Sequence, residues 1–301
     1  MTTPPLLTLG PVLFNWPAER WCDFYARIAD EAPVDVVHLG EIVCSKRLPF
    51  LADQFGPAVE RLEAAGKTVV LSTPILVTTE RERAALAELV EAAPGPVEAN
   101  DLAAVALLAG RPHLVGPYVN VYNEATLAWM AARGALSVSL NPELPAPSVG
   151  VLAAAAADLG VDVEVQVFGR MPLAISARCY HARSHGLHKD GCQFVCGNDP
   201  DGLAVATLDA QPFLAVNGTQ TLSHACLDLS GALEALTAQG VRRLRLSPHA
   251  VDMVRVARGF RDVLDGRRDA AALSADLADL VAGMPLADGF YHDRAGYERV
   301  A

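Results

Sequence analysis

Short apolar runs rich in β-branched residues alternate along the chain with longer segments in which alanine and leucine recur at helical spacing. This alternation is typical of βα units built around a parallel sheet. The runs predict eight strands, at Leu6–Phe14, Val34–Leu39, Thr68–Ser72, Val97–Ala99, Tyr118–Tyr122, Leu136–Leu140, Val161–Val167 and Arg243–Leu246. The longer segments predict helices at Glu19–Ala29, Ala52–Ala65, Glu80–Ala92, Leu102–Ala109, Glu124–Ala132, Val149–Leu159, Ser230–Ala238 and Val251–Leu264. Eight strand–helix units predict a (β/α)8 TIM-like barrel, with residues 1–301 as one domain.

One connection is much longer than the others. Between the seventh and eighth predicted strands the chain runs for about seventy-five residues, whereas βα loops usually have 2–6. We therefore predict an insertion at residues 176–227, after strand 7. Its second half contains two β-prone runs that predict a hairpin. A C-terminal helix and tail are predicted at residues 270–301.

Three cysteines gather in the predicted insertion, and a fourth lies far upstream. Cys179, Cys192 and Cys196 are spaced C-x12-C-x3-C, and Cys44 follows the second predicted strand. Because Cys44 and Cys179 both follow carboxyl ends of strands, they belong at the same mouth of the barrel. A long insertion can cross that mouth and bring the four sulfurs together, so the sequence predicts a metal centre, either an iron–sulfur cluster or a zinc ion.

The cysteine spacing favours the iron–sulfur cluster. It lacks the short C-x2-C knuckle of most structural zinc sites, and it lacks the C-x3-C-x2-C triplet of radical enzymes that bind S-adenosylmethionine. A 4Fe–4S cluster accepts widely spaced ligands, so we expect one on Cys44, Cys179, Cys192 and Cys196. The alternative is a Cys3His zinc site that uses His181, His185 or His188.

Basic and imidazole side chains flank the cysteines. Arg178, His181 and Arg183 are close enough in sequence to donate hydrogen bonds to sulfur, which would raise the reduction potential. Lys46 and Arg47 follow Cys44 and could balance thiolate charge. The opposing interpretation of each is an ordinary exposed loop residue.

Other polar residues and cysteines receive less specific predictions. Cys22 and Cys226 are expected to pack as small buried side chains. Glu164 and Gln166 are predicted to point into the barrel, where a hydrogen-bonded structural role is an equal alternative. Candidates for contact with a substrate at the mouth or interior of the barrel are Glu41, Asn100, Asn120, Glu143 and Glu164.

Composition limits the class of partner. The chain has 35 acidic and 24 basic side chains and a net charge of −11, which repels nucleic acid and anionic lipid. It has no apolar run of the roughly 18 residues that span a bilayer, so no transmembrane segment is expected. The start of the chain lacks the basic and apolar regions of an export signal. We therefore expect a cytoplasmic protein with reduced thiols.

Four stretches together resemble a known family. They are G-E-I-V-C-S-K-R at Gly40–Arg47, A-R-C-Y-H-A-R at Ala177–Arg183, H-K-D-G-C-Q-F-V-C at His188–Cys196 and A-V-N-G-T-Q-T-L-S at Ala215–Ser223. The chain resembles the collagenase-like peptidase superfamily over most of its length. Within that superfamily it is similar to the branch that acts in oxygen-independent ubiquinone biosynthesis.

The resemblance implies a cofactor, a partner and a reaction. It implies a 4Fe–4S cluster on the same four cysteines and a heterodimer with a sister protein of the UbiU type. It also implies hydroxylation of aromatic ubiquinone precursors with oxygen from a donor such as prephenate. A cluster capped by four cysteines has no open coordination site, so its expected role is electron transfer or structural support.

Two alternatives remain at this point. The superfamily name suggests a peptidase, although the sequence has no G-x-S-x-G or H-E-x-x-H motif. It also has no evident cysteine–histidine pair outside the metal candidates. The second alternative is a zinc-stabilised barrel that serves only as a binding module.

Overall fold

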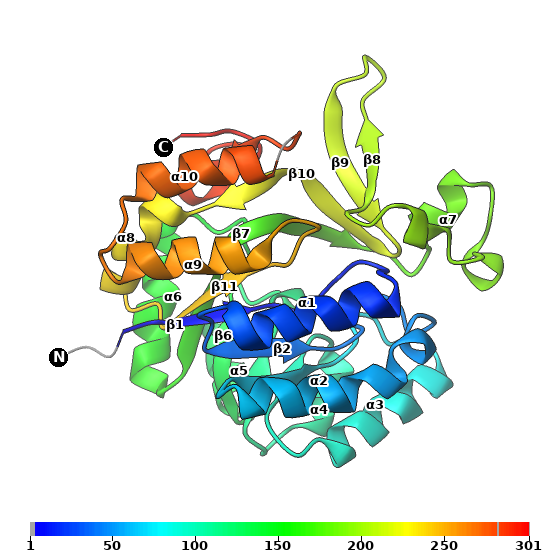
Figure 1. Ribbon diagram of the computed structural model, residues 1–301. Helices are drawn as coiled ribbons and strands as arrows, with labels where there is room; N and C mark the ends of the chain where they lie inside the picture. The colour runs from blue at the N-terminus through cyan, green and yellow to red at the C-terminus, as the bar shows by residue number, and fades with distance from the viewer. Residues whose placement is uncertain (1–3, 282, 301) are drawn as a thin grey trace.

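The protein is described by a computed structural model at residues 4–281 and 283–300. In that part of the chain, eight parallel strands form a closed barrel, because β11 pairs with both β7 and β1 (Figure 1). In barrel order the strands are β1 (Leu6–Leu9), β2 (Val36–Leu39), β3 (Thr68–Ser72), β4 (Val97–Ala99), β5 (His113–Val115), β6 (Ala135–Ser139), β7 (Asp162–Ile175) and β11 (Arg243–Leu246). The predicted TIM-like α/β barrel is therefore confirmed.

Helices cover the outside of the barrel (Figure 1). Those that follow barrel strands are α1 (Ala18–Glu31), α2 (Ala52–Ala64), α3 (Glu80–Ala92), α4 (Leu102–Leu107), α5 (Glu124–Ala131), α6 (Ala146–Leu159) and α9 (Met253–Leu264). The others are α7 (Tyr180–Ser184), α8 (Leu233–Ala238) and α10 (Ala270–Leu280). No described helix has both the length and the apolar character needed to cross a membrane.

Side chains at the ends of the helices explain where several of them begin. Thr79 and Glu82 form a reciprocal capping box at the start of α3. Asp101 and Asn123 cap α4 and α5 by accepting hydrogen bonds from backbone N–H groups. The inward faces of the helices then pack against the strands in one continuous apolar core.

Two strand predictions at the start and middle of the barrel are wrong. The first strand ends at Leu9 instead of Phe14, because Gly10 and Pro11 follow it and proline cannot donate to a ladder. The fifth strand is His113–Val115, and the predicted run Tyr118–Tyr122 begins in a 3-10 turn at Pro117–Val119. The β-branched and aromatic content of that run suggested a strand, but Pro117, whose ring fixes φ at about −65°, begins a 3-10 turn there.

Strand β7 continues well beyond its predicted end at Val167. Its first half pairs in parallel with β6 and β11, and its second half pairs antiparallel with β10 (Gln220–Asp228). The change occurs near Gly169, whose φ is +113° and where an added Cβ would lie 2.7 Å from the backbone oxygen of Ser247. Only glycine fits this close approach, so the sequence around Gly169 directs β7 out of the barrel.

The segment after β7 forms three strands where the sequence predicted a hairpin. β8 (Leu203–Ala206) pairs with β9 (Pro212–Asn217), and β9 pairs with β10, all antiparallel. Figure 1 shows β8 and β9 projecting from the barrel, with α7 beside them. Near the C-terminus, β12 (Leu286–Ala287) adds to β10 in parallel. Residues 282 and 301 of the predicted C-terminal helix and tail lie outside the described part.

Candidate metal centre

The four candidate ligands line one small cavity. Cys44, Cys179, Cys192 and Cys196 all border it, together with Arg47, His181, Ala182, Lys189, Phe194, Val195 and Gly218. Cys44 comes from the loop after β2, and the other three come from the segment after β7. This cavity, the cysteine pocket, is therefore formed by parts of the chain that are far apart in sequence.

Glu41 and Arg47 shape the loop that carries Cys44. Glu41 Oε1 accepts hydrogen bonds of 3.0 Å from the backbone N–H groups of Val43 and Cys44. Arg47 is 1% exposed and donates to the carbonyl oxygen of Leu13 at 3.0 Å. The guanidinium lies 3.9 Å from Glu41, so the two buried charges partly neutralise each other.

The turn between β9 and β10 holds the same loop from the other side. Asn217 Oδ1 accepts from Arg47 at 3.0 Å, and Thr219 Oγ1 donates to the carbonyl oxygen of Val43 at 3.0 Å. Gly218 between them has φ +63°, and an added Cβ would lie 2.9 Å from Arg47 Nη2. The N-G-T sequence therefore fits the turn closely against the Cys44 loop.

Lys46 links the Cys44 loop to the segment that carries Cys192. Its Nζ donates to the carbonyl oxygen of Lys189 and to Asp190 Oδ1, both at 2.7 Å. Phe194, between Cys192 and Cys196, has φ +53° and packs edge-on against Phe50 with ring centroids 4.7 Å apart. This aromatic contact also joins the two segments.

Hydrogen-bond donors already face two of the sulfurs. Asn15 Nδ2 donates to Cys196 Sγ, and the backbone N–H of Ala182 donates to Cys179 Sγ, both at 3.4 Å. His181 is fully buried, and its Nε2 lies 2.7 Å from Asp199 Oδ2. His181 Nδ1 and Arg47 Nε are buried without a hydrogen-bond partner, in side chains that line the cysteine pocket. Such unpartnered polar atoms fit a pocket shaped around an additional polar group.

The separation of the ligand atoms bears on which metal they fit. A tetrahedral zinc ion with bonds of about 2.3 Å holds its sulfurs roughly 3.8 Å apart. In the described residues, no three ligand atoms drawn from these cysteines and the histidines near them lie within 4.8 Å of one another. The thiols as placed therefore do not form a preassembled zinc tetrahedron.

Burial keeps the Cys44 and Cys179 thiols protonated. It raises the pKa of Cys44 and of Cys179, although Arg47 opposes the shift at both. Burial also lowers the pKa of His181 more than Asp199 raises it, so the imidazole is neutral at pH 7. A metal bound at these cysteines would displace thiol protons, and the cation Arg47 is placed to balance the resulting negative charge.

The remaining sequence candidates lie in different surroundings. Arg178 and Arg183 are exposed and do not line the cysteine pocket, whereas His181 does. Cys226 is fully buried in the core, as predicted. Cys22 is half-buried, packs against the core and donates to Gln54 Oε1 at 3.2 Å.

The sequence did not identify Asn15, Asn217 and Thr219 as parts of this site. Asn15 lies in the loop after β1, and its contact with Cys196 spans 181 residues of sequence. Arg47 was considered only as local positive charge. The N-G-T turn was visible as a motif, but its contact with the Cys44 loop depends on the tertiary fold.

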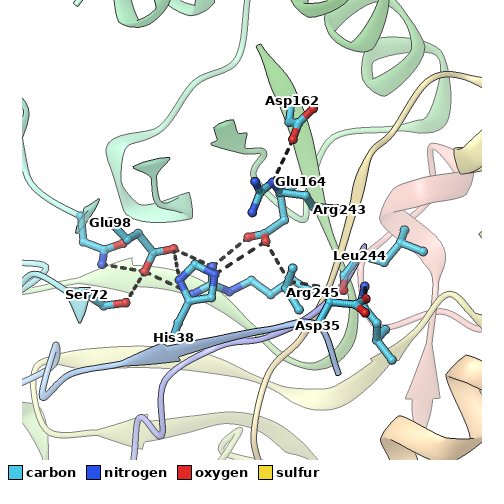
Figure 2. A network of polar contacts seen from close by, with 12 residues as sticks. Asp35, His38, Ser72, Glu98, Asp162, Glu164, Arg243, Leu244 and Arg245 are labelled. Atoms are coloured by element: carbon cyan, nitrogen blue, oxygen red, sulfur yellow. Dashed lines mark hydrogen bonds and ion pairs between the residues drawn. The ribbon is translucent and has the colours of Figure 1, made fainter. Parts of the chain in front are cut away.

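A second polar cluster fills the interior of the barrel (Figure 2). Arg245 Nη1 donates to Glu98 Oε1 at 2.6 Å and to Glu164 Oε1 at 2.8 Å. His38 lies between the same carboxylates, with its ring nitrogens 3.3 Å from Glu98 and 3.9 Å from Glu164. Thr8 donates to Glu164 at 2.8 Å, so the charges are enclosed by further hydrogen bonds. Glu164 therefore points into the barrel and has a hydrogen-bonded structural role there, one of the two alternatives that the sequence left open.

Ligand atoms of His38, Glu98 and Glu164 lie within 4.8 Å of one another, a spacing that suits a metal ion. However, the guanidinium of Arg245 already contacts both carboxylates. The two ring nitrogens of His38 also face different carboxylates and cannot both bind one ion. The geometry therefore favours a compensated ion network that braces the barrel.

We expect this network to make the protein less stable in acid. Burial raises the pKa of Glu98 and Glu164, but Arg245 and His38 outweigh burial and hold both values below the ordinary range. The ionised carboxylates therefore stabilise the fold above the unfolded-state pKa of about 4.3, and this contribution is lost as pH falls through the folded values. Denaturant unfolding at a series of pH values measures the effect. The Glu98→Gln variant should show a shallower loss, and equal slopes for variant and wild type would contradict the assignment.

The other candidates for contact with a substrate are engaged in local structure. Asn100 Nδ2 donates to the carbonyl oxygen of Thr73 at 3.1 Å. Asn120 accepts from Asn141 at 2.8 Å, and Glu143 accepts from Tyr122. Among the five candidates for contact with a substrate, Glu41 is the one that hydrogen-bonds to the backbone of the Cys44 loop.

The fold and the site together define a TIM-like barrel with a cysteine-lined pocket at the carboxyl ends of its strands. The chain belongs to peptidase family U32, whose family model matches residues 23–301.

Three solved structures are similar to this chain at low sequence identity. A putative dihydrodipicolinate synthase family protein from Coccidioides immitis is 12% identical, with 91% of this chain and 77% of that chain covered and a TM-score of 0.41. Dihydrodipicolinate synthase from Aquifex aeolicus is 9% identical, with 92% and 81% covered and a TM-score of 0.39. The spore cortex-lytic enzyme SleL from Bacillus megaterium is 10% identical, with 87% and 75% covered and a TM-score of 0.42. The strand order of this chain, not these scores, establishes the barrel.

Proposed function

We propose that this chain is a UbiV-like iron–sulfur subunit of an oxygen-independent hydroxylase that acts on aromatic ubiquinone precursors. Its cofactor is a 4Fe–4S cluster on Cys44, Cys179, Cys192 and Cys196. Its partner is a UbiU-like sister protein, and the hydroxyl oxygen comes from a donor such as prephenate. Membership of the U32 family and the resemblance of the cysteine motifs to the ubiquinone branch both support this proposal.

One observation carries the cofactor assignment: all four cysteines border one pocket that also contains a fully enclosed guanidinium. A buried guanidinium can balance the negative charge of thiolates, and Glu41 offsets the charge of Arg47 only in part. The cysteine spacing, which lacks a C-x2-C knuckle, favours a cluster over zinc. Asn15 and the Ala182 N–H already donate to sulfur.

The residues of this chain have separable tasks in the proposal. The four thiolates hold the cluster, which supplies electron transfer or structural support when bound. Arg47 balances negative charge, and Asn15 tunes the electron density on Cys196. Phe194 lines the pocket, and its contact with Phe50 joins the two segments that carry the ligands. None of these groups can serve as an oxygen donor, so hydroxylation needs components beyond this chain.

Reconstitution of the isolated protein tests this division of labour. Anaerobically reconstituted protein should show the visible absorption of an iron–sulfur cluster and no hydroxylation of an aromatic precursor. Addition of the UbiU-like partner and the oxygen donor should produce turnover. Hydroxylation by the isolated chain would contradict the proposal.

Peptide hydrolysis is a second candidate, favoured by one arrangement in the structure. Asp199 orients His181, and this carboxylate–imidazole pair lies beside the cysteine thiols. A cysteine peptidase uses a histidine base, oriented by a third group, to activate one thiol. However, His181 Nδ1 has no hydrogen-bond partner, so no described sulfur is engaged by the base. Peptide cleavage by iron-free protein, lost in Cys-to-Ala variants, would favour this function over the first.

A further inference from the structure

An elongated apolar cavity of about 290 Å³ lies beside α3, separate from the cysteine pocket. It is lined along this helix by Glu82, Ala85, Leu86, Leu89 and Ala92, which lie on one helical face. The distance along the axis from Glu82 to Ala92 is about 15 Å at a rise of about 1.5 Å per residue. The cavity is therefore long enough for a chain-like molecule.

The other walls of the cavity come from the outside of the barrel and from α2. Leu39 of β2, Leu71 of β3 and Phe55 of α2 line it. β2 is paired on both sides, with β1 and β3, so its backbone offers no free hydrogen-bonding edge. A peptide in this cavity would bring polar backbone groups without partners. The lining suits an apolar chain that needs no hydrogen bonds.

One end of the cavity is polar and adjoins the Cys44 loop. Glu41 and Ser45 line it there, and Ser45 Oγ donates to Glu82 Oε1 at 2.8 Å. Glu41 also caps the backbone of Cys44. A ligand at this end is thus next to the residues that shape the cysteine pocket, while the opposite end lies at Ala92.

We propose that this cavity binds the apolar chain of an alkylated aromatic molecule, with the ring at the Ser45 end. The inference rests on the proposed function for the choice of an aromatic ring. The chain-binding part rests on the cavity alone. The site would place the ring beside the cysteine pocket and hold its tail between α3 and the barrel.

Variants that fill the cavity test this inference. Ala85 and Ala92 are exposed on α3, so Ala85→Trp and Ala92→Phe can fill the cavity without replacing a core residue. Ala84, also exposed on α3, does not line the cavity, so Ala84→Trp is the matched control. The probes are 2-farnesylphenol, with a long apolar chain, and 2-allylphenol, with a short one. Titration calorimetry measures binding, while thermal melting and iron content check each variant.

We expect wild-type protein to bind 2-farnesylphenol saturably and Ala85→Trp to weaken binding by about tenfold or more. Ala92→Phe should weaken binding of the farnesyl probe and leave the allyl probe unaffected, and Ala84→Trp should match wild type. No binding by wild type, or equal binding by Ala85→Trp, would overturn the inference. Iron content separates the two proposals. Wild-type protein that holds no iron but binds 2-farnesylphenol, with weaker binding by Ala85→Trp, contradicts only the iron–sulfur cluster. Iron-loaded wild-type protein that does not bind the probe contradicts only the chain-binding role of the cavity.

Discussion

Replacement of Cys192 or Cys196 by alanine is expected to remove almost all bound iron and acid-labile sulfide from the protein. Both sulfurs line the cysteine pocket, and loss of either leaves three protein thiolates for a cluster that takes four. Cys196 is also the sulfur that accepts from Asn15. Iron and sulfide per chain, measured after anaerobic reconstitution, give the result directly.

Cys22→Ala is the matched control for these variants. Cys22 is a half-buried thiol that contacts Gln54 and does not line the cysteine pocket. Its iron and sulfide content should equal that of wild type. Equal iron in all three variants would mean that other groups hold the metal.

The second large effect is expected inside the barrel, where Arg245→Met should reduce the free energy of unfolding by about 3–5 kcal/mol. The substitution leaves the carboxylates of Glu98 and Glu164 buried without their guanidinium partner. Both side chains are almost fully enclosed, so water cannot replace the lost hydrogen bonds. Denaturant unfolding of variant and wild type at neutral pH measures the difference.

Arg243→Met provides the control on the same strand. Arg243 pairs with Asp162 at 3.1 Å, but the aspartate side chain is 39% exposed. A pair of this kind contributes about 0–1 kcal/mol, so this variant should unfold near the wild-type midpoint. Equal destabilisation by the two substitutions would show that the interior network does not brace the barrel.

The barrel could be predicted because its signals are local. Strand–helix alternation at Thr68–Ser72 and Glu80–Ala92 matches the structure residue for residue. The cysteine spacing is also a local signal, because three of the four cysteines lie within one short segment. The ligand set drawn from it stays a prediction. Prediction failed where a short strand lay between prolines, as at His113–Val115, because β-propensity alone selected the longer run after it.

The surroundings of the site depend on long-range contacts that the sequence does not display. Arg47 is buried because the turn at Asn217 closes over it, and the two are 170 positions apart. The interior network similarly joins His38, Glu98 and Arg245 from three strands. The sequence placed these residues in strands. Which of them face the interior became clear only with the closed barrel.

The content of iron, sulfide and zinc in anaerobically purified wild-type protein tests the central claim most directly. The account predicts about four iron and four sulfide per chain, with visible absorption and without stoichiometric zinc. One zinc per chain without sulfide would contradict it, and so would protein that binds neither metal at the four cysteines.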